Sequence, residues 1–283
     1  MSTAVYTNSA GVSFNLLDFN VVRLKDAQLH KYEWNPEGVK YQFGELLQTF
    51  TKEALVFPVT FKVFGNETNR KNLLNSFHDA TEHDIFLMQK GTLVVDGYSI
   101  ECYIIASDTI APENNEAETT NEASIYCPYP FWIKETKYEI EAKGTAQVVD
   151  GLDFDFDLPC DLGVSGYKKT IYFDTTIPLD FRMVIYGECI NPTITINGHV
   201  YEVDVTVPAN STLTISSIEK NDREKAVYIT YPSGNTQSVL YARNRDSYIF
   251  EPIKSSGAVV ITAAMTVKFD LYLIEKRSEP KWI

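Results

Sequence analysis

The row Asp153-Phe154-Asp155-Phe156-Asp157 comes nearer to a catalytic pattern than any other stretch of this sequence. In a β-strand every second side chain points to the same face, so the three carboxylates would share one face and the two phenylalanines the other. Paired carboxylates can cleave a glycosidic bond or hold calcium. A glycosidase, however, needs carboxylates that face each other across a cleft, and these stand in a row. We therefore favour a structural interpretation, in which the phenylalanines face the core and the aspartates face water.

The histidines and cysteines predict neither a metal site nor a catalytic set. They are His30, His78, His83 and His199, and Cys102, Cys127, Cys160 and Cys189. Their spacing contains no close pair that would bind zinc. We expect reduced, packed thiols, with two disulfides in an oxidising compartment as the alternative. His78 and His83 flank the end of a predicted helix, where a cation complements the helix dipole. No nucleophile elbow or phosphate-binding glycine loop is present, so we expect a protein that is not an enzyme and has no cofactor.

Composition favours a soluble protein built mainly from strands. The chain has 283 residues, 44% of them hydrophobic, with 17 tyrosines and 16 phenylalanines. Aromatic side chains suit the pleated surface of a sheet, and this length can bury one large core or two ordinary ones. The first residues do not resemble a secretory signal, and no window approaches the ~20 apolar residues that span a bilayer. We therefore expect synthesis in a cytoplasm and no membrane partner.

The net charge of −13 at pH 7 argues against stable binding of nucleic acid, which requires clustered lysine and arginine. An acidic surface would instead let DNA pass without adhering. The acidic segment from Glu113 to Glu122 has no large apolar residue, so we expect a mobile loop. It either becomes ordered against a partner or stays solvated.

The alternation of apolar residues predicts many strands and one helix. Helical spacing of Leu73, Leu74, Phe77 and Ala80 predicts a helix over 68–80. We expect strands over 12–16, 19–24, 85–88, 92–98 and 100–105, with Asp96-Gly97 as a hairpin turn. Residues 32–38 are expected to form a turn. Residues 55–64 predict a strand whose Pro58 indicates an edge position or a bulge.

From Thr136 onward, strand follows strand, with turn signals that include Asn191-Pro192 and Asn197-Gly198. This number and spacing of strands predicts a sandwich or jelly roll. We place the domain boundary near Lys134. The expected fold is therefore mostly β, with an N-terminal β-barrel-like domain and one α-helix over 1–134 and a β-sandwich over 135–283.

Three phrases of the sequence together resemble the distal tail protein (Dit) family of siphophages. They are the segments 127–132, 187–198 and 277–282, and the positions that carry the motif are Cys127, Pro128, Pro130, Trp132, Asn191, Pro192, Gly198, Pro280 and Trp282. Each phrase is short, and the resemblance rests on their order and spacing across nearly the whole chain. The order of the parts also fits the family, in which the C-terminal domain is a galectin-like β-sandwich of jelly-roll type.

The resemblance implies a structural role in the virion, assembled in the host bacterial cytoplasm. Members of the family form a hexameric adaptor ring through the N-terminal domain. The ring joins the tail tube protein to the tail-associated hub protein, with receptor-binding proteins as further partners of the tail tip. DNA passes through the lumen without specific binding, and we expect part of the negative charge to line it.

The alternative is a carbohydrate-binding host-recognition protein with a lectin-like sandwich. His199 is the candidate for sugar contact, because lectins of this architecture often use a histidine on a strand. The galectin pattern His-x-Asn-x-Arg is absent, however, because His199 is followed by Val200-Tyr201-Glu202-Val203. The Asn197-Gly198 pair before it also has a backbone explanation, since type I′ turns prefer these residues.

Overall fold

The protein consists of two compact units. The computed structural model describes residues 3–18, 20–110, 117–141, 166–175, 177–218, 225–264 and 267–281. Unit 1 comprises Met1–Lys134 with Lys276–Ile283, and unit 2 comprises Glu135–Glu275. Our assignment of all of 135–283 to the second domain is therefore wrong at its end. Pro280 is buried, and the Glu279 carboxylate lies 3.7 Å from Nδ1 of His30, so the C-terminal residues contact unit 1.

Unit 1 is a strongly bent antiparallel sheet with one helix. Its elements are β1 (Ala4–Thr7), β2 (Ser13–Asn15), β3 (Val22–Ala27), β4 (Asn35–Lys40), β5 (Glu45–Thr51), β6 (Leu55–Phe64), α1 (Glu67–Phe86), β7 (Gly91–Val95), β8 (Tyr98–Ile110), β9 (Glu118–Cys127) and the start of β10 (Trp132–Ile140). Apart from β4 and β5, the strands pair in the order β2-β1-β7-β8-β9-β6-β3. A hydrogen bond from Leu24 N–H to the Leu16 carbonyl (3.1 Å) links the two ends of this order. Among the described residues β2 and β3 do not pair as strands, so the expected barrel-like closure stays a prediction.

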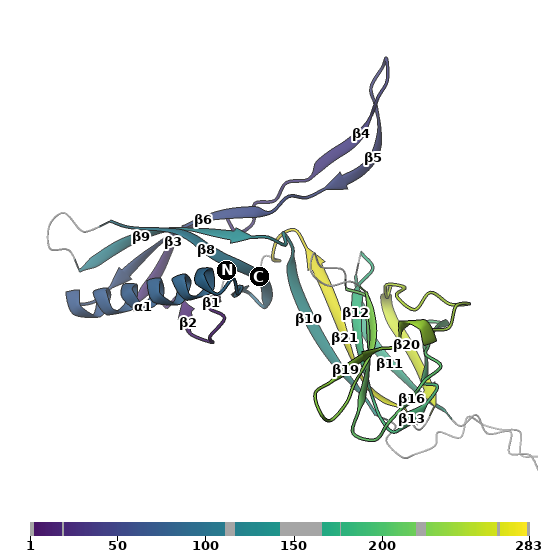
Figure 1. Ribbon diagram of the computed structural model, residues 1–283. Coiled ribbons are helices and arrows are strands. Elements are labelled where there is room, and N and C mark those ends of the chain that lie inside the picture. Colours follow the sequence, from purple (N-terminus) through teal and green to yellow (C-terminus); the bar gives the residue numbers. More distant parts are fainter. Residues whose placement is uncertain are drawn as a thin grey trace, which may run out of the picture. The chain divides into compact units, whose positions relative to one another are not determined.

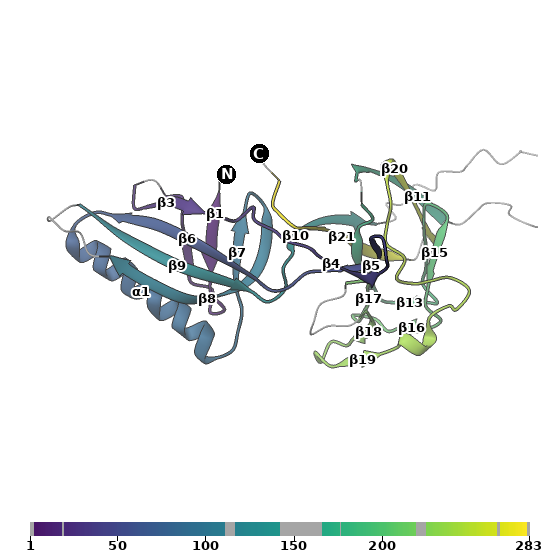
Figure 2. The same cartoon turned by 90° about the horizontal axis from the view of Figure 1, so that it is seen from above.

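Helix α1 is longer than the apolar stripe indicates. Leu74, Phe77 and Ala80 are buried as expected, and α1 lies along β8 in both views (Figure 1, Figure 2). The helix continues to Phe86, so the expected strand over 85–88 is wrong and His78 lies inside the helix instead of at its end. Asp84 explains the difference: its buried carboxylate accepts hydrogen bonds from the Tyr6 hydroxyl (2.7 Å) and the Ser9 N–H (2.8 Å). These bonds hold the last turn of α1 in place, although the apolar Ile85 and Phe86 of that turn are exposed and continue no buried stripe.

The expectation for Pro58 holds locally, and the expected loop after β8 is corrected. Strand β6 pairs with both β3 and β9 from Val59 onward, but β3 stops at Val59. Pro58 therefore has a paired strand on one side only, as its missing N–H requires. The loop expected over 113–122 ends earlier, because β9 begins at Glu118. The buried amide of Asn121 donates to Ser107 (2.9 Å) and Thr109 (3.0 Å), so paired polar groups take the place of apolar side chains there.

Unit 2 is a β-sandwich. Its elements are the rest of β10, β11 (Gly166–Asp174), β12 (Asp180–Tyr186), β13 (Cys189–Ile190), β14 (Thr193–Ile196), β15 (His199–Glu202), β16 (Thr206–Val207), β17 (Thr212–Ser216), β18 (Ala226–Thr230), β19 (Thr236–Ser238), the 3₁₀ turn η1 (Leu240–Ala242), β20 (Ser256–Ala264) and β21 (Lys268–Arg277). One sheet has the order β19-β18-β17-β12-β21-β10 and the other β11-β20-β14-β15. Alternate residues of each sheet, such as Phe181, Met183 and Ile261, share one buried core. The predicted fold class, mostly β with one α-helix and a sandwich, is confirmed.

The two predicted Gly turns are also confirmed. Asp96-Gly97 joins β7 to β8 and Asn197-Gly198 joins β14 to β15, and all four residues have positive φ (47°, 83°, 50° and 83°). These are the backbone angles of a type I′ hairpin turn. Separately, no helix in the described ranges is long and apolar enough to cross a membrane.

Candidate functional site

Strands β4 and β5 form a two-stranded arm that extends beyond the sheet of unit 1 (Figure 1). We call residues Asn35–Thr51 the β4–β5 arm. Its strands pair with each other and with no other strand of the described chain. The Tyr41 N–H donates to the Gly44 carbonyl (3.0 Å) at the tip, and Gly44 has a φ of 89°, which only glycine adopts without strain. The sequence expectation of a turn over 32–38 is therefore wrong, because the turn lies at 41–44.

The β4–β5 arm exposes large apolar side chains along its whole length. The exposed fractions are 88% for Phe43, 61% for Tyr41, 57% for Leu46 and 53% for Phe50, and Val39 and Leu47 are exposed as well. An isolated two-stranded hairpin is at best marginally stable in water. Apolar residues gathered on an exposed segment mark a surface that binds another protein. The β4–β5 arm is thus the candidate interaction site of unit 1.

A lysine among aromatic rings fixes the base of the β4–β5 arm. The Nζ of Lys52, the residue after β5, lies 4.6 Å from the ring centre of Phe131, 5.4 Å from that of Trp34 and 5.9 Å from that of Tyr32. Trp34 and Phe131 also contact each other edge to face, with ring centres 5.8 Å apart. Cation–π contacts of this kind hold both ends of the β4–β5 arm against the segment that precedes Trp132.

We expect the stability of the wild type to rise relative to that of Lys52→Met when the pH is raised. Burial lowers the pKa of Lys52 from 10.5 to about 8. Between these values the unfolded chain binds a proton that the folded chain has released, so the stability contribution of Lys52 increases with pH across this window. Urea unfolding of both proteins at about pH 7 and about pH 10, followed by tryptophan fluorescence, measures the change. A stability difference that stays constant or moves the other way contradicts the prediction.

The motif positions in unit 1 are structural. Cys127 and Trp132 are fully buried, and the ring centre of Trp132 lies 6.2 Å from that of Phe57. Pro130 and Pro280 are buried and Pro128 is half-buried.

A hydrogen bond to Cys127, together with burial, raises the pKa of the Cys102 thiol. The described cysteines, Cys102, Cys127 and Cys189, are all free and buried. Trp282 and Cys160 lie outside the described residues.

The motif positions in unit 2 shape turns. Asn191 has a φ of 47°, Pro192 is buried and Gly198 belongs to the β14–β15 turn. His199, the candidate for sugar contact, has its Nε2 2.9 Å from the Tyr248 carbonyl, so this nitrogen donates. Its ring packs on Tyr201 at 4.9 Å between centres and lines a pocket of about 210 Å³. A sugar-binding role of His199 stays a prediction.

The remaining candidates are the carboxylate row and two histidines of α1. The carboxylate row 153–157 lies outside the described residues. Among the residues that the structure describes, no three His, Cys, Asp or Glu side chains form a group that could hold a metal ion. His83 lies in the last turn of α1, as expected, with its Nδ1 3.3 Å from the Ser9 hydroxyl. His78 has its Nε2 3.0 Å from the Ser107 hydroxyl.

Comparison with known proteins gives likenesses in structure alone. No protein-family model matches the sequence, and no curated protein matches it. The crystal structure of the SPP1 Dit protein (gp 19.1), described as a paradigm of the hub adsorption apparatus in phages that infect Gram-positive bacteria, matches with a TM-score of 0.55 and 10% identity, over 97% of this chain and 99% of that chain. A chain of the activated, Ca-containing phage P2 baseplate matches with a TM-score of 0.52 and 9% identity, over 98% and 99%. Over nearly its whole length, the chain therefore has the fold of the SPP1 Dit protein.

Proposed function

We propose that the chain is a structural, non-enzymatic component of a phage tail tip and that six copies close into an adaptor ring. The β4–β5 arm is the observation that carries this proposal. Its apolar side chains cannot be buried by its own unit, so a neighbouring copy is the surface that covers them. The likeness in fold to the SPP1 Dit protein and to a baseplate chain supports the same conclusion.

A contact between the β4–β5 arm and a different surface of the next copy generates a ring. Such a heterologous contact repeats from copy to copy until the last closes on the first. Unit 1 offers a second exposed apolar group at the end of α1, where Phe86 is 81% exposed, Leu87 53% and Met88 80%. We propose this turn as the surface that receives the β4–β5 arm of the neighbouring copy.

In the virion, the ring would join the tail tube protein to the tail-associated hub protein and let DNA pass through its lumen. The net charge of −13 suits this task, because a wall of like charge lets a polyanion slide without adhering. We propose that part of this charge lines the lumen. A basic lumen in the assembled ring would contradict this part of the proposal.

Sizing of the purified full chain tests the ring directly. Light scattering is expected to give about six times the 32.1 kDa of one chain, and negative-stain images are expected to show closed rings with a central opening. The same measurements are then made with the tail tube protein and the hub protein added. They test whether the ring closes only when these two proteins are present. A chain that stays monomeric in all of these mixtures contradicts the proposal.

A further inference from the structure

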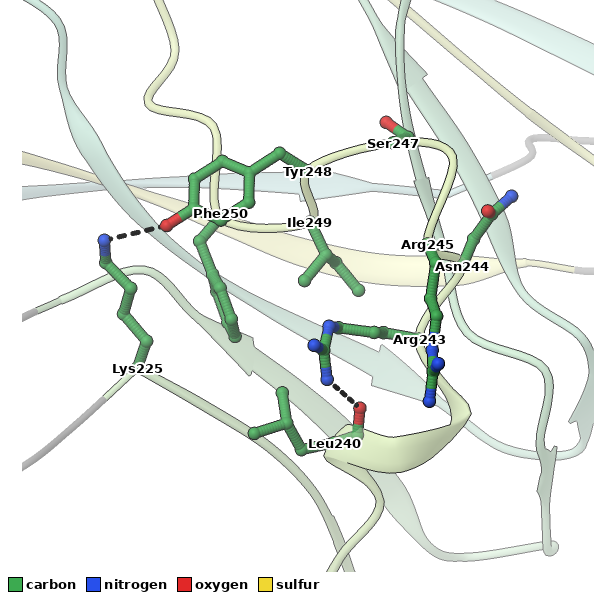
Figure 3. A pocket seen from close by; sticks show the side chains of 9 residues that line it. All are labelled: Lys225, Leu240, Arg243, Asn244, Arg245, Ser247, Tyr248, Ile249 and Phe250. Carbon is green, nitrogen blue, oxygen red and sulfur yellow. Dashed lines mark hydrogen bonds between the residues drawn. The ribbon is translucent and has the colours of Figure 1, made fainter.

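Unit 2 contains a pocket of about 810 Å³ beside the turn η1 (Figure 3). It lies within the range of small-ligand sites. Its lining residues come from the segment before β18, from η1 and from the loop after η1: Lys225, Leu240, Arg243, Asn244, Arg245, Ser247, Tyr248, Ile249 and Phe250. The pocket belongs to unit 2 alone, so binding of a ligand there does not depend on the proposed ring.

The described lining of this pocket is basic, although the chain as a whole carries 38 acidic against 25 basic residues. Among the residues that the structure describes, the lining holds three cations and no carboxylate. Lys225 and Arg243 lie on opposite sides of Phe250 (Figure 3). Arg245 is exposed, and its guanidinium makes no hydrogen bond or ion pair with the part of the chain that the structure describes. Arginine binds phosphate and carboxylate groups in a forked geometry, so the lining favours an anion.

Hydrogen bonds hold the loop of the pocket in place before any ligand arrives. His199 Nε2 donates to the Tyr248 carbonyl (2.9 Å) and the Ser247 hydroxyl donates to the Val200 carbonyl (2.5 Å). At the other end, Arg243 Nη1 donates to the Leu240 carbonyl (2.9 Å). A site held by its own framework loses less conformational entropy on binding than a mobile loop does.

An aromatic face lies next to the cations. Tyr248 is 54% exposed, while Ile249 and Phe250 behind it are buried. The Lys225 amine donates to the Tyr248 hydroxyl (3.0 Å), which fixes the edge of the ring and leaves its face as apolar contact area. The pocket thus combines groups for an anion with one flat surface for an adjoining ring.

We infer that this pocket binds an anionic saccharide. The phosphate or carboxylate lies against the guanidinium groups of Arg243 and Arg245, and the apolar face of the sugar ring packs on Tyr248. A nucleic-acid strand fits the pocket less well. Such strands bind along grooves in which cations and several stacking rings continue from base to base, and the described part of this lining offers a single exposed ring.

Titration of the full chain at low ionic strength tests this inference, with glucose 1-phosphate, glucuronic acid, glucose, inorganic phosphate and a thymidine oligonucleotide as probes. Either anionic sugar is expected to bind more tightly than glucose and than inorganic phosphate. Its affinity should fall as salt is added, because the contacts are ionic.

Arg245→Ala is expected to weaken binding of the anionic sugar by roughly tenfold, and Tyr248→Ala should weaken it while sparing inorganic phosphate. Lys168→Ala, which removes an exposed cation of the same unit outside the pocket, is the matched control and should change nothing. Equal binding of glucose and the anionic sugars overturns the inference. So does an unchanged affinity of Arg245→Ala, or a pocket that binds the oligonucleotide or inorganic phosphate more tightly than either anionic sugar.

Discussion

The double substitution Phe43→Asp, Leu46→Asp is expected to abolish ring formation while leaving the single chain folded. Both side chains lie on the β4–β5 arm and are 88% and 57% exposed, so a carboxylate in either place meets water in the monomer. In the assembled ring the same carboxylates would be buried without a partner, which costs roughly 2 kcal/mol or more at each contact. Every interface of the ring carries this penalty. Light scattering of the variant should therefore give the mass of one chain.

A matched control separates loss of the contact from added charge. Tyr172 and Ile190 of unit 2 are 76% and 72% exposed and lie outside the β4–β5 arm, so Tyr172→Asp, Ile190→Asp should still form rings. Circular dichroism of both variants checks that the strands are retained. Rings that persist when Phe43 and Leu46 are replaced would contradict the assignment of the β4–β5 arm as the contact between copies.

Trp132→Ala is expected to destabilise unit 1 by about 3–5 kcal/mol. Trp132 is fully buried and packs against Phe57 at 6.2 Å between ring centres. Its removal forfeits the burial of a large ring and leaves a cavity in a close-packed core. Because Trp34 and Trp282 remain in the sequence, urea unfolding followed by tryptophan fluorescence measures the loss.

Two further substitutions serve as comparisons for Trp132→Ala. Trp132→Phe keeps much of the ring and removes an indole N–H that has no hydrogen-bond partner among the described residues, so it should cost distinctly less. Trp34→Ala, followed by the fluorescence of the two remaining tryptophans, should also cost less, because Trp34 is 40% exposed. Equal losses for Trp132→Ala and Trp34→Ala would contradict the role of Trp132 as a core residue.

Features that depend on short-range patterns could be predicted from the amino-acid order. Alternating apolar residues predicted the sandwich of unit 2, and the spacing of Leu74, Phe77 and Ala80 predicted the start and the buried face of α1. The Asp96-Gly97 and Asn197-Gly198 turns followed from backbone preference alone. In each case the physical cause lies within a few residues of its effect, since one side of the element faces a core or one residue tolerates positive φ.

Contacts between distant parts of the chain determine where polar residues are buried and where apolar residues stay exposed. These positions could not be predicted from the amino-acid sequence. Asp84 is buried in the last turn of α1 and Asn121 is buried within β9 because partners more than ten residues away satisfy their hydrogen bonds. The sequence pattern did not predict the β4–β5 arm, because there apolar residues stay exposed instead of polar residues being buried. Its strands face no core of their own chain, so residues such as Phe43 follow no alternation that periodicity could detect. The pocket beside η1 also depends on contacts distant in sequence, because His199 and Val200 hold the loop that carries Tyr248 and Arg245.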